Sequence, residues 1–409
     1  MNQFKYYHGF IFSIISVLFL YLLHHLPVNQ LFIDPFSEAI KHQDLIDVSF
    51  SKFRDHNDPK LFDNRIFVIN TGITDRKKIA KTINFLSSRS TKVIGVDLLF
   101  DTLYTTPDDT LLSIAIANSS RVILGFSFEE AKIPYHSTME MHSHPFFANN
   151  VKEAYFNLAT NDGFSVRTFE PFHMVENTEM PSFSTKIAME YEPEVLARLK
   201  SRGVDKEWIN FRRVQPGISN MIFPINSGQN SHYALVNIDQ FLADTSAYEE
   251  EYFKDKIVLI GFCGEHDGSL SMKDRYYTPL NERSSGRSVP DMFGVIIHAN
   301  IISMLLDSDF IDDVPEFLLY LFAFLIFFVN YFIFLRVIER KFFFTVAFIR
   351  LIQILQFIFL YSVCILLLCV LNIKLGFILI ITAVILSFEL FEFYQHRFKH
   401  RVNKILSTY

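Results

Sequence analysis

The chain has 409 residues, of which 50% are hydrophobic and 16% aromatic, and its mean hydropathy of +0.22 is too high for an ordinary soluble protein. Charged residues still make up 20% of the sequence, which excludes a chain that lies wholly within a bilayer. The formal net charge of −6 argues against nucleic acid as a partner. These properties predict a membrane protein with a large aqueous domain.

Four apolar stretches have about the length needed to cross a bilayer. The first covers residues 10–26, and no small-residue cleavage site follows it, so we interpret it as an uncleaved anchor rather than a signal peptide. The others cover residues 316–335, 351–371 and 375–394. We therefore divide the chain into an N-terminal anchor (1–27), an aqueous domain (28–313), three transmembrane helices (314–394) and a basic tail (395–409).

Lysine and arginine are unevenly distributed around these stretches. The turn at 372–376 has only Lys374, whereas the preceding loop and the tail contain Arg336, Arg340, Lys341, Arg350, Arg397, Lys399, Arg401 and Lys404. Because basic residues mark the cytoplasmic side of a membrane protein, both termini are predicted to be cytoplasmic. The aqueous domain is then extracytoplasmic, and the predicted location is the cytoplasmic (inner) membrane.

The aqueous domain shows alternating strand and helix patterns. Residues 65–70, 92–100 and 121–128 are apolar runs typical of buried strands. The segments between them begin with helix-start signals, Thr74 as an N-cap and Thr106 followed by Pro107. This alternation predicts a mixed α/β domain with a mostly parallel sheet. Residues 133–150 are expected to be irregular, and the turn signal at 161–163 predicts a hairpin over 155–172.

The stretch 256–306 is expected to organise the domain. Its apolar start, 257–262, predicts a strand, and a polar loop with Asp267, Asp274 and Thr278 follows. An apolar-periodic segment with His298 then predicts a helix that ends at Leu306. Since the next apolar stretch begins at residue 316, a change in the loop has a short mechanical route to the bilayer.

Polar residues that follow predicted strands are candidates for a ligand site. Ligands of open α/β sheets bind beyond the carboxyl ends of the strands. Asp97 ends one strand and Asp101 follows it, while Asp267, Asp274, Thr278 and His298 follow another. We predict a polar pocket from these residues, and the alternative is that they only cap loops and hold the domain together.

Other candidate chemistry has weaker support. His136, His142 and His144, interspersed with two methionines, could bind copper or zinc, but a surface loop is the favoured interpretation, and no cofactor is expected. Cys263 lacks an identifiable base, so a buried structural cysteine is favoured over a nucleophile or redox thiol. The segment GFCGEHDG lacks the Lys-Ser/Thr pair of a phosphate-binding loop.

Four segments carry a family resemblance: FVINTGITDRKKIAKTINFLSSRSTKVIGVDLLFDTLYTTPDDTLLSIAIANSSRVIL, DGFSVRTFEPF, KIVLIGFCGEHDGSLSMKDRYYTPL and GVIIHANIISMLL. In this order, with one apolar stretch before and three after, they resemble the CHASE-two (CHASE type 2, or CHASE2) family of extracellular sensor domains. The resemblance implies a membrane-anchored bacterial sensor with a periplasmic domain. Family members typically have an effector after the last span, whereas this chain stops at Tyr409. Asn70 and Thr71 stand where an acid is usual, and 282–290 is an unusual insertion.

These observations predict a membrane-bound extracytoplasmic sensor or receptor that binds an unknown ligand. Signal transduction is expected to run through the transmembrane helices to a separate cytoplasmic or membrane effector protein, with no enzymatic activity in this chain. The alternative is a non-signalling structural or assembly subunit of an envelope complex. A third hypothesis, an envelope hydrolase using Asp97, Asp274 and His298, has no motif to support it. Dimerisation of two identical chains through the aromatic-rich spans is a further hypothesis.

Overall fold

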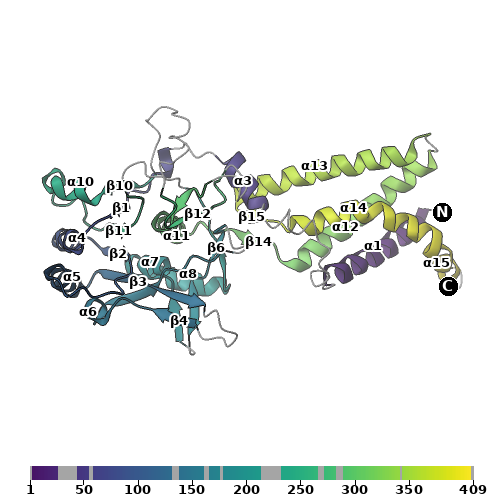
Figure 1. The fold of residues 1–409 in the computed structure, drawn as a ribbon. Coiled ribbons are helices and arrows are strands. Elements are labelled where there is room, and N and C mark those ends of the chain that lie inside the picture. Colours follow the sequence, from purple (N-terminus) through teal and green to yellow (C-terminus); the bar gives the residue numbers. More distant parts are fainter. Residues whose placement is uncertain are drawn as a thin grey trace. The chain divides into compact units, whose positions relative to one another are not determined.

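The computed structural model describes residues 2–25, 44–54, 59–130, 138–160, 165–175, 178–212, 232–265, 271–281, 289–340 and 343–406 (Figure 1). Its internal contacts divide the chain into two compact units. We call residues 46–310 the α/β unit, and residues 1–45 together with 311–409 the helical unit. Each unit is described by itself.

A mostly parallel sheet forms the centre of the α/β unit. Its strand order is β10-β1-β11-β2-β3-β4, and β5 pairs with β3. Every pair is parallel except β3 with β4. The bounds are β1 Ile66–Asn70, β2 Val93–Asp97, β3 Val122–Glu130, β4 Thr138–Met141, β5 Lys152–Tyr155, β10 Ala234–Asn237 and β11 Ile257–Gly261. The predicted mixed α/β fold with a mostly parallel sheet is confirmed.

Helices cover both faces of this sheet (Figure 1). On one face lie α4 (Arg76–Ser88), α5 (Pro107–Ala117) and α10 (Ile238–Ala243). On the other lie α7 (Phe183–Tyr191) and α11 (Gly294–Asp307). Gly261 lets α11 approach β11 closely, because a Cβ atom there would lie 2.9 Å from Val295 Cβ.

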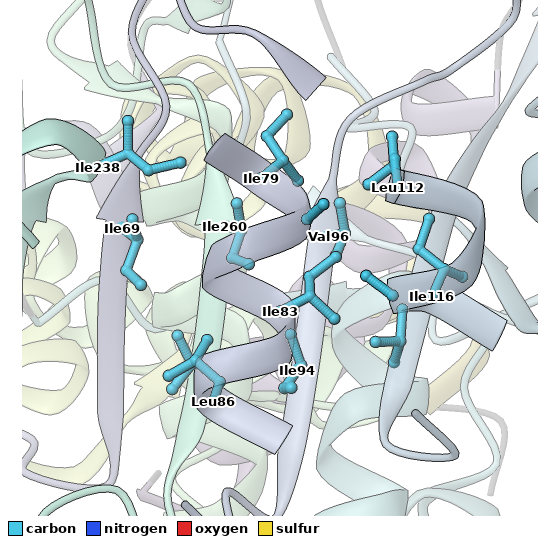
Figure 2. Close-up of a cluster of buried hydrophobic side chains, with 14 of the residues drawn as sticks. Ile69, Ile79, Ile83, Leu86, Ile94, Val96, Leu112, Ile116, Ile238 and Ile260 are labelled. Atoms are coloured by element: carbon cyan, nitrogen blue, oxygen red, sulfur yellow. The ribbon is translucent and has the colours of Figure 1, made fainter. Parts of the chain in front are cut away.

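The main hydrophobic core lies under α4 and α5, as Figure 2 shows. Ile83 and Leu86 of α4 meet Ile94 and Val96 of β2, and all four side chains are fully buried. Burying one such side chain stabilises the folded state by about 1.5–3 kcal/mol. This packing holds the first turns of both helices at the carboxyl edge of the sheet.

Two local expectations need correction. The N-cap of α4 is Asp75, not Thr74, because the Asp75 carboxylate accepts a hydrogen bond from Lys78 N at 2.8 Å. The predicted irregular segment contains β4 and a short helix, α6 (Pro145–Ala148). The predicted hairpin turn at 161–163 lies outside the described residues, and one antiparallel bridge, Thr160 to Val166, flanks it. The Thr106 cap of α5 is confirmed as a full capping box with Asp109.

Smaller elements complete the α/β unit. The helices are α3 (Leu45–Phe53) and α8 (Glu194–Arg202), with 3₁₀ turns at Pro59–Leu61 and Thr245–Ala247. The short strands pair as β6 (Thr168–Phe169) with β9 (Glu207–Trp208), β7 (Phe172–Val175) with β8 (Thr178–Pro181), and β12 (Arg275–Tyr276) with β13 (Met292–Phe293).

The helical unit contains four helices that are long and apolar enough to cross a membrane, as predicted. They are α1 (Asn2–His25), α12 (Glu316–Glu339), α13 (Thr345–Leu371) and α14 (Phe377–Phe393), of which α14 continues through a π-helical turn, Tyr394–Phe398, into α15 (Lys399–Leu406). Strand β14 (Asp312–Asp313), just before α12, pairs in parallel with β15 (Ile373–Lys374), just before α14.

Polar side chains join α12, α13 and α14 inside this apolar bundle. Asn330 donates to Ser387 Oγ at 3.1 Å and accepts from Gln356 Nε2 at 2.6 Å. Gln353 donates to the backbone oxygen of Val384 at 2.7 Å. Asn330 and Ser387 are fully buried. Hydrogen bonds between helices therefore satisfy polar side chains that would otherwise lack a partner in an apolar bundle. The network therefore fixes the register of three predicted spans.

Candidate functional site

The central strands end side by side at the carboxyl edge of the sheet. In the strand register, Asn70 of β1 lies opposite Gly261 of β11, which lies opposite Asp97 of β2. Asn70 Nδ2 donates to the oxygen of Gly264 at 3.0 Å, and its Oδ1 accepts from Cys263 N at 2.7 Å. Asn70 therefore ties the end of β1 to the loop that follows β11.

A cleft of about 560 Å³ opens beside this edge. Its walls come from the loops after β1 and β2, the first turns of α4 and α5, and one residue of the loop after β11. The lining residues are Thr71, Gly72, Thr74, Asp75, Arg76, Ile79, Leu98, Leu99, Phe100, Tyr104, Thr106, Asp108 and Lys273. The volume is that of an ordinary small-molecule site.

Internal contacts fix one wall of the cleft. Arg76 forms an ion pair with the buried carboxylate of Asp109 and donates to the oxygen of Thr102 at 2.6 Å. Its guanidinium also lies 4.5 Å from the ring centroid of Tyr104. Gly72 has a φ of +55°, and a Cβ atom there would lie 2.8 Å from the Glu265 oxygen. Arg76 and Gly72 thus hold the two strand-end loops in place.

Two carboxylates interact next to the cleft. Burial, followed by the charge of Asp274, raises the pKa of Asp97 well above its ordinary range. Burial raises the pKa of Asp274 to about 6, against the opposing effects of the Tyr276 hydroxyl and of Lys273. Each acid is the chain neighbour of a cleft residue, because Leu98 follows Asp97 and Lys273 precedes Asp274.

One acid of this pair, Asp274, also touches the start of α11. A Cβ atom at Gly294 would lie 3.0 Å from Asp274 Oδ1, and Gly294 N donates to the backbone oxygen of Asp274 at 3.1 Å. The carboxylate of Asp274 therefore lies at the positive N-terminal end of a helix. Any displacement of residues 273–274 acts directly on the first residue of α11.

The far end of α11 is held by ion pairs. Ser303 donates to Asp63 Oδ2 at 2.7 Å, and Arg65 bridges Asp63 and Asp307 at 2.6 and 2.7 Å. Beyond the helix, Asp309 pairs with Arg212. The exit from α11 toward residue 316 is thus anchored to the α/β unit.

A model of the CHASE2 domain family matches residues 58–337, more than half of the chain. The chain belongs to the CHASE2 domain family. CHASE2 domains are sensor domains, and the match covers the described α/β unit from Pro59 onward and most of α12. No protein of curated function and no solved structure matches the chain.

Asn70 stands where the family resemblance leads us to expect an acid, and it both donates and accepts hydrogen bonds. Its amide nitrogen donates to Asn237 Oδ1 at 2.8 Å and to Gly264, while its oxygen accepts from the amides of Gly72 and Cys263. A carboxylate could accept the two hydrogen bonds from Gly72 and Cys263, but it could not donate the two to Asn237 and Gly264. An amide is therefore the side chain that suits this loop arrangement.

The structure separates the residues that the sequence grouped into one pocket. Asp97 and Asp274 come together, whereas Asp101 is exposed and accepts from Thr102 Oγ1 at 3.0 Å. Thr278 is buried, and its N–H and hydroxyl both donate to Asp291, which closes the base of the loop. Asp267 lies outside the described residues. Whether any of them contacts a ligand stays a prediction.

His298 lies between α11 and α7 rather than beside the acid pair. Its Nδ1 is 2.8 Å from Ser184 Oγ. Burial lowers the pKa of His298 to about 4, so the ring is neutral at physiological pH. The contact with Ser184 joins α11 to α7.

The predicted histidine cluster is divided as well. His142 lies between Glu140 and Glu153, at 2.8 and 3.1 Å, whereas His144 caps α6 by accepting from Phe146 N. His136 lies outside the described residues. In the described part of the chain, no group of three or more His, Cys, Asp or Glu side chains could hold a metal ion.

Cys263 is buried, and burial followed by the charges of Asp274 and Asp97 raises its thiol pKa, which disfavours the reactive thiolate.

Sequence reasoning missed most of the cleft. It placed the site after β2 and β11, and it overlooked the loop after β1 with Gly72, Thr74 and Arg76. A signal was available, because β1 is also a parallel strand and its carboxyl end lies at the same edge. Lys273 carried no signal beyond its place next to Asp274.

Proposed function

We propose that this chain is a membrane-bound sensor whose α/β unit lies outside the cytoplasm and binds a small ligand in the cleft. The observation that carries the proposal is the arrangement around Asp97 and Asp274. Both acids have a cleft-lining chain neighbour, and Asp274 also contacts the first residue of α11. A ligand that displaces Lys273 therefore changes the environment of α11. Membership of a sensor-domain family supports the same conclusion.

The signal route in this proposal is α11 itself. With 14 residues, the helix is about 21 Å long at a rise of about 1.5 Å per residue. Its N-terminus meets Asp274, and its C-terminal end is anchored through Asp63, Arg65 and Asp307. Residues 308–315 then lead to the predicted second span. We propose that a shift of α11 passes along this chain connection to the spans and on to a separate cytoplasmic partner protein.

Thr74 provides a physical reason for two states of the cleft. Its hydroxyl oxygen is buried and has no hydrogen-bond partner among the described residues. Leaving a buried polar group unpaired costs about 1–3 kcal/mol. If the loop after β1 shifts so that this hydroxyl finds a partner, that cost is removed in the shifted conformation only. A ligand that requires the shifted loop therefore binds that conformation more tightly. Such differential affinity is what a ligand needs to move an equilibrium.

Affinity purification of the full-length protein from mildly solubilised membranes tests this proposal. We expect the wild type to retain a cytoplasmic protein and a variant that lacks residues 395–409 to lose it. The Gly72→Ala variant is expected to retain a different amount of the cytoplasmic protein, because the added Cβ atom displaces the loop that lines the cleft. Gly203→Ala is the matched control, since Gly203 also has a positive φ but has no neighbour within 4 Å of the added atom.

The result that contradicts the proposal is specific. If the shortened chain and the Gly72→Ala variant retain the same proteins as the wild type, the cleft does not control a cytoplasmic partner. Retention of an envelope protein through the α/β unit alone would instead support the assembly-subunit hypothesis.

A further inference from the structure

The cleft contains one free charge of each sign. Of its four charged residues, Arg76 is paired with Asp109, and Asp75 caps α4. The other two, Asp108 and Lys273, have no hydrogen bond from their charged groups and no ion pair with any described residue, although the positive charge of Lys273 also acts on the Asp274 carboxylate. Asp108 is half-buried in the first turn of α5, and Lys273 is exposed, with its ammonium 5.4 Å from the Phe262 ring centroid. Two free opposite charges are therefore available to a ligand.

Multiply charged anions fit this cleft poorly, although two helices of eleven or more residues begin at it. Three of the amides near these helix starts are already occupied by side chains of the protein itself. Asp75 accepts from Lys78 N at 2.8 Å, and Asp109 accepts from Tyr104 N and Thr106 N at 2.9 and 3.2 Å. A phosphate would also face the free carboxylate of Asp108.

The rest of the lining is mixed, with Thr71, Thr74 and Thr106 beside aliphatic and aromatic side chains. Leu98, Leu99 and Ile79 contribute aliphatic surface, and the Tyr104 ring is held under the guanidinium of Arg76. A lining of this mixed kind contacts both the polar and the hydrocarbon parts of a small ligand, and its charged groups orient the ligand. The volume of about 560 Å³ accommodates a free amino acid or a dipeptide.

From these contacts we infer that the cleft binds a small zwitterion, in the class of a free α-amino acid or short peptide. The ligand carboxylate pairs with Lys273, and its ammonium group pairs with Asp108. This inference rests on the proposed sensor function and names the class of its ligand. It also assigns Lys273, the chain neighbour of Asp274, as the residue through which the ligand reaches α11.

Calorimetric titration of the full-length protein in lipid nanodiscs tests the inference. The probes are the twenty common amino acids, followed by the N-acetyl derivative and the methyl ester of the one that binds best. The N-acetyl derivative lacks the positive charge, and the ester lacks the negative charge. We expect the parent amino acid to bind at least about ten-fold more tightly than either derivative, since a hydrogen bond to a charged group contributes that much or more.

Variants assign each charge to its residue. Asp108→Asn is expected to remove the preference for the parent amino acid over its N-acetyl derivative. Lys273→Ala is expected to remove the preference for the parent amino acid over its methyl ester. Glu250→Gln and Lys77→Ala remove the same charges from exposed positions outside the cleft, and they are expected to retain both preferences. This pairing of two ligands with two variants separates a direct contact from a general loss of stability.

Two outcomes overturn the inference: no amino acid binds the wild type, or each variant weakens binding of all three ligands equally. The proposed sensor function fails differently. If no amino acid binds but Gly72→Ala still changes partner retention while Gly203→Ala does not, only the ligand class is refuted.

Discussion

Replacing Asp274 with asparagine is expected to stabilise the α/β unit at alkaline pH and to leave it nearly unchanged at acid pH. Burial raises the pKa of Asp274 from an ordinary value of 3.8 to about 6, with Asp97 as its acidic neighbour. The folded state therefore binds a proton more tightly than the unfolded chain. The resulting stabilisation is complete below about pH 4 and is lost as the pH rises through 6.

The magnitude follows from the size of this shift. A shift of about two pKa units corresponds to about 3 kcal/mol, since each unit is worth about 1.4 kcal/mol. The side chain is partly exposed, so we expect the variant to gain about 1–3 kcal/mol at pH 8. Asparagine suits the position, because it tolerates the φ of +55° observed there and can still accept from Tyr276.

The single tryptophan, Trp208 in β9, makes the assay specific to the α/β unit. Thermal unfolding of the full-length protein, followed by tryptophan fluorescence between pH 4 and pH 8, is expected to show a smaller decline in Tm for Asp274→Asn than for the wild type. A gain of 1 kcal/mol raises Tm by about 2–4 °C in a unit of this size. Asp101→Asn is the exposed control. An unchanged pH dependence, or equal destabilisation at both pH values, would refute the reasoning.

Three further predictions concern other parts of the chain. Burial lowers the pKa of His142, but its two glutamate partners raise the pKa more. The protonated ring therefore stabilises the folded state below pH 6.5, and this stabilisation is lost at higher pH. His142→Gln is expected to lower Tm at pH 6 more than at pH 9. Asn330→Leu removes buried interhelical hydrogen bonds, and it is expected to cost about 0.6–2 kcal/mol in unfolding of the helical unit by SDS, whereas Val329→Leu on an exposed position costs little. A fluorescent reporter fused after Tyr409 is expected in the cytoplasm, and a reporter found outside contradicts the predicted topology.

The strands and spans could be predicted because burial leaves a direct mark on them. β1, β2 and β11 are buried at every position except Asp97, which ends β2. A strand covered on both faces is apolar throughout, so its composition alone identifies it. The four long helices were predictable for a related reason, because each is long and apolar enough to cross a membrane.

The cleft could not be predicted in the same way, because the sheet order is not the chain order. β11, from the distant stretch at 257–261, lies between β1 and β2, and so it brings Lys273 beside Gly72 and Leu98. A sequence pattern records which side chains are buried, but it does not record which loops become neighbours. The interhelical amide of Asn330 was missed for a related reason: one polar residue in an apolar helix does not reveal its partners.

The proposed contact between the ligand and Lys273 predicts that binding is linked to proton uptake. Lys273 opposes the rise in the pKa of Asp274, because its positive charge favours the ionised carboxylate. A ligand carboxylate that pairs with Lys273 cancels this effect, so the pKa of Asp274 rises further on binding. Near pH 6.5, part of the protein then takes up a proton with the ligand, and binding is tighter at lower pH.

Titration in buffers of different ionisation enthalpy measures this proton uptake. We expect a fraction of one proton per ligand for the wild type and none for Asp274→Asn, with Asp101→Asn behaving as the wild type. Proton uptake that persists in Asp274→Asn would assign it to another group and break the proposed link between the cleft and the N-terminus of α11. An amino acid that binds without proton uptake would show that its carboxylate does not reach Lys273.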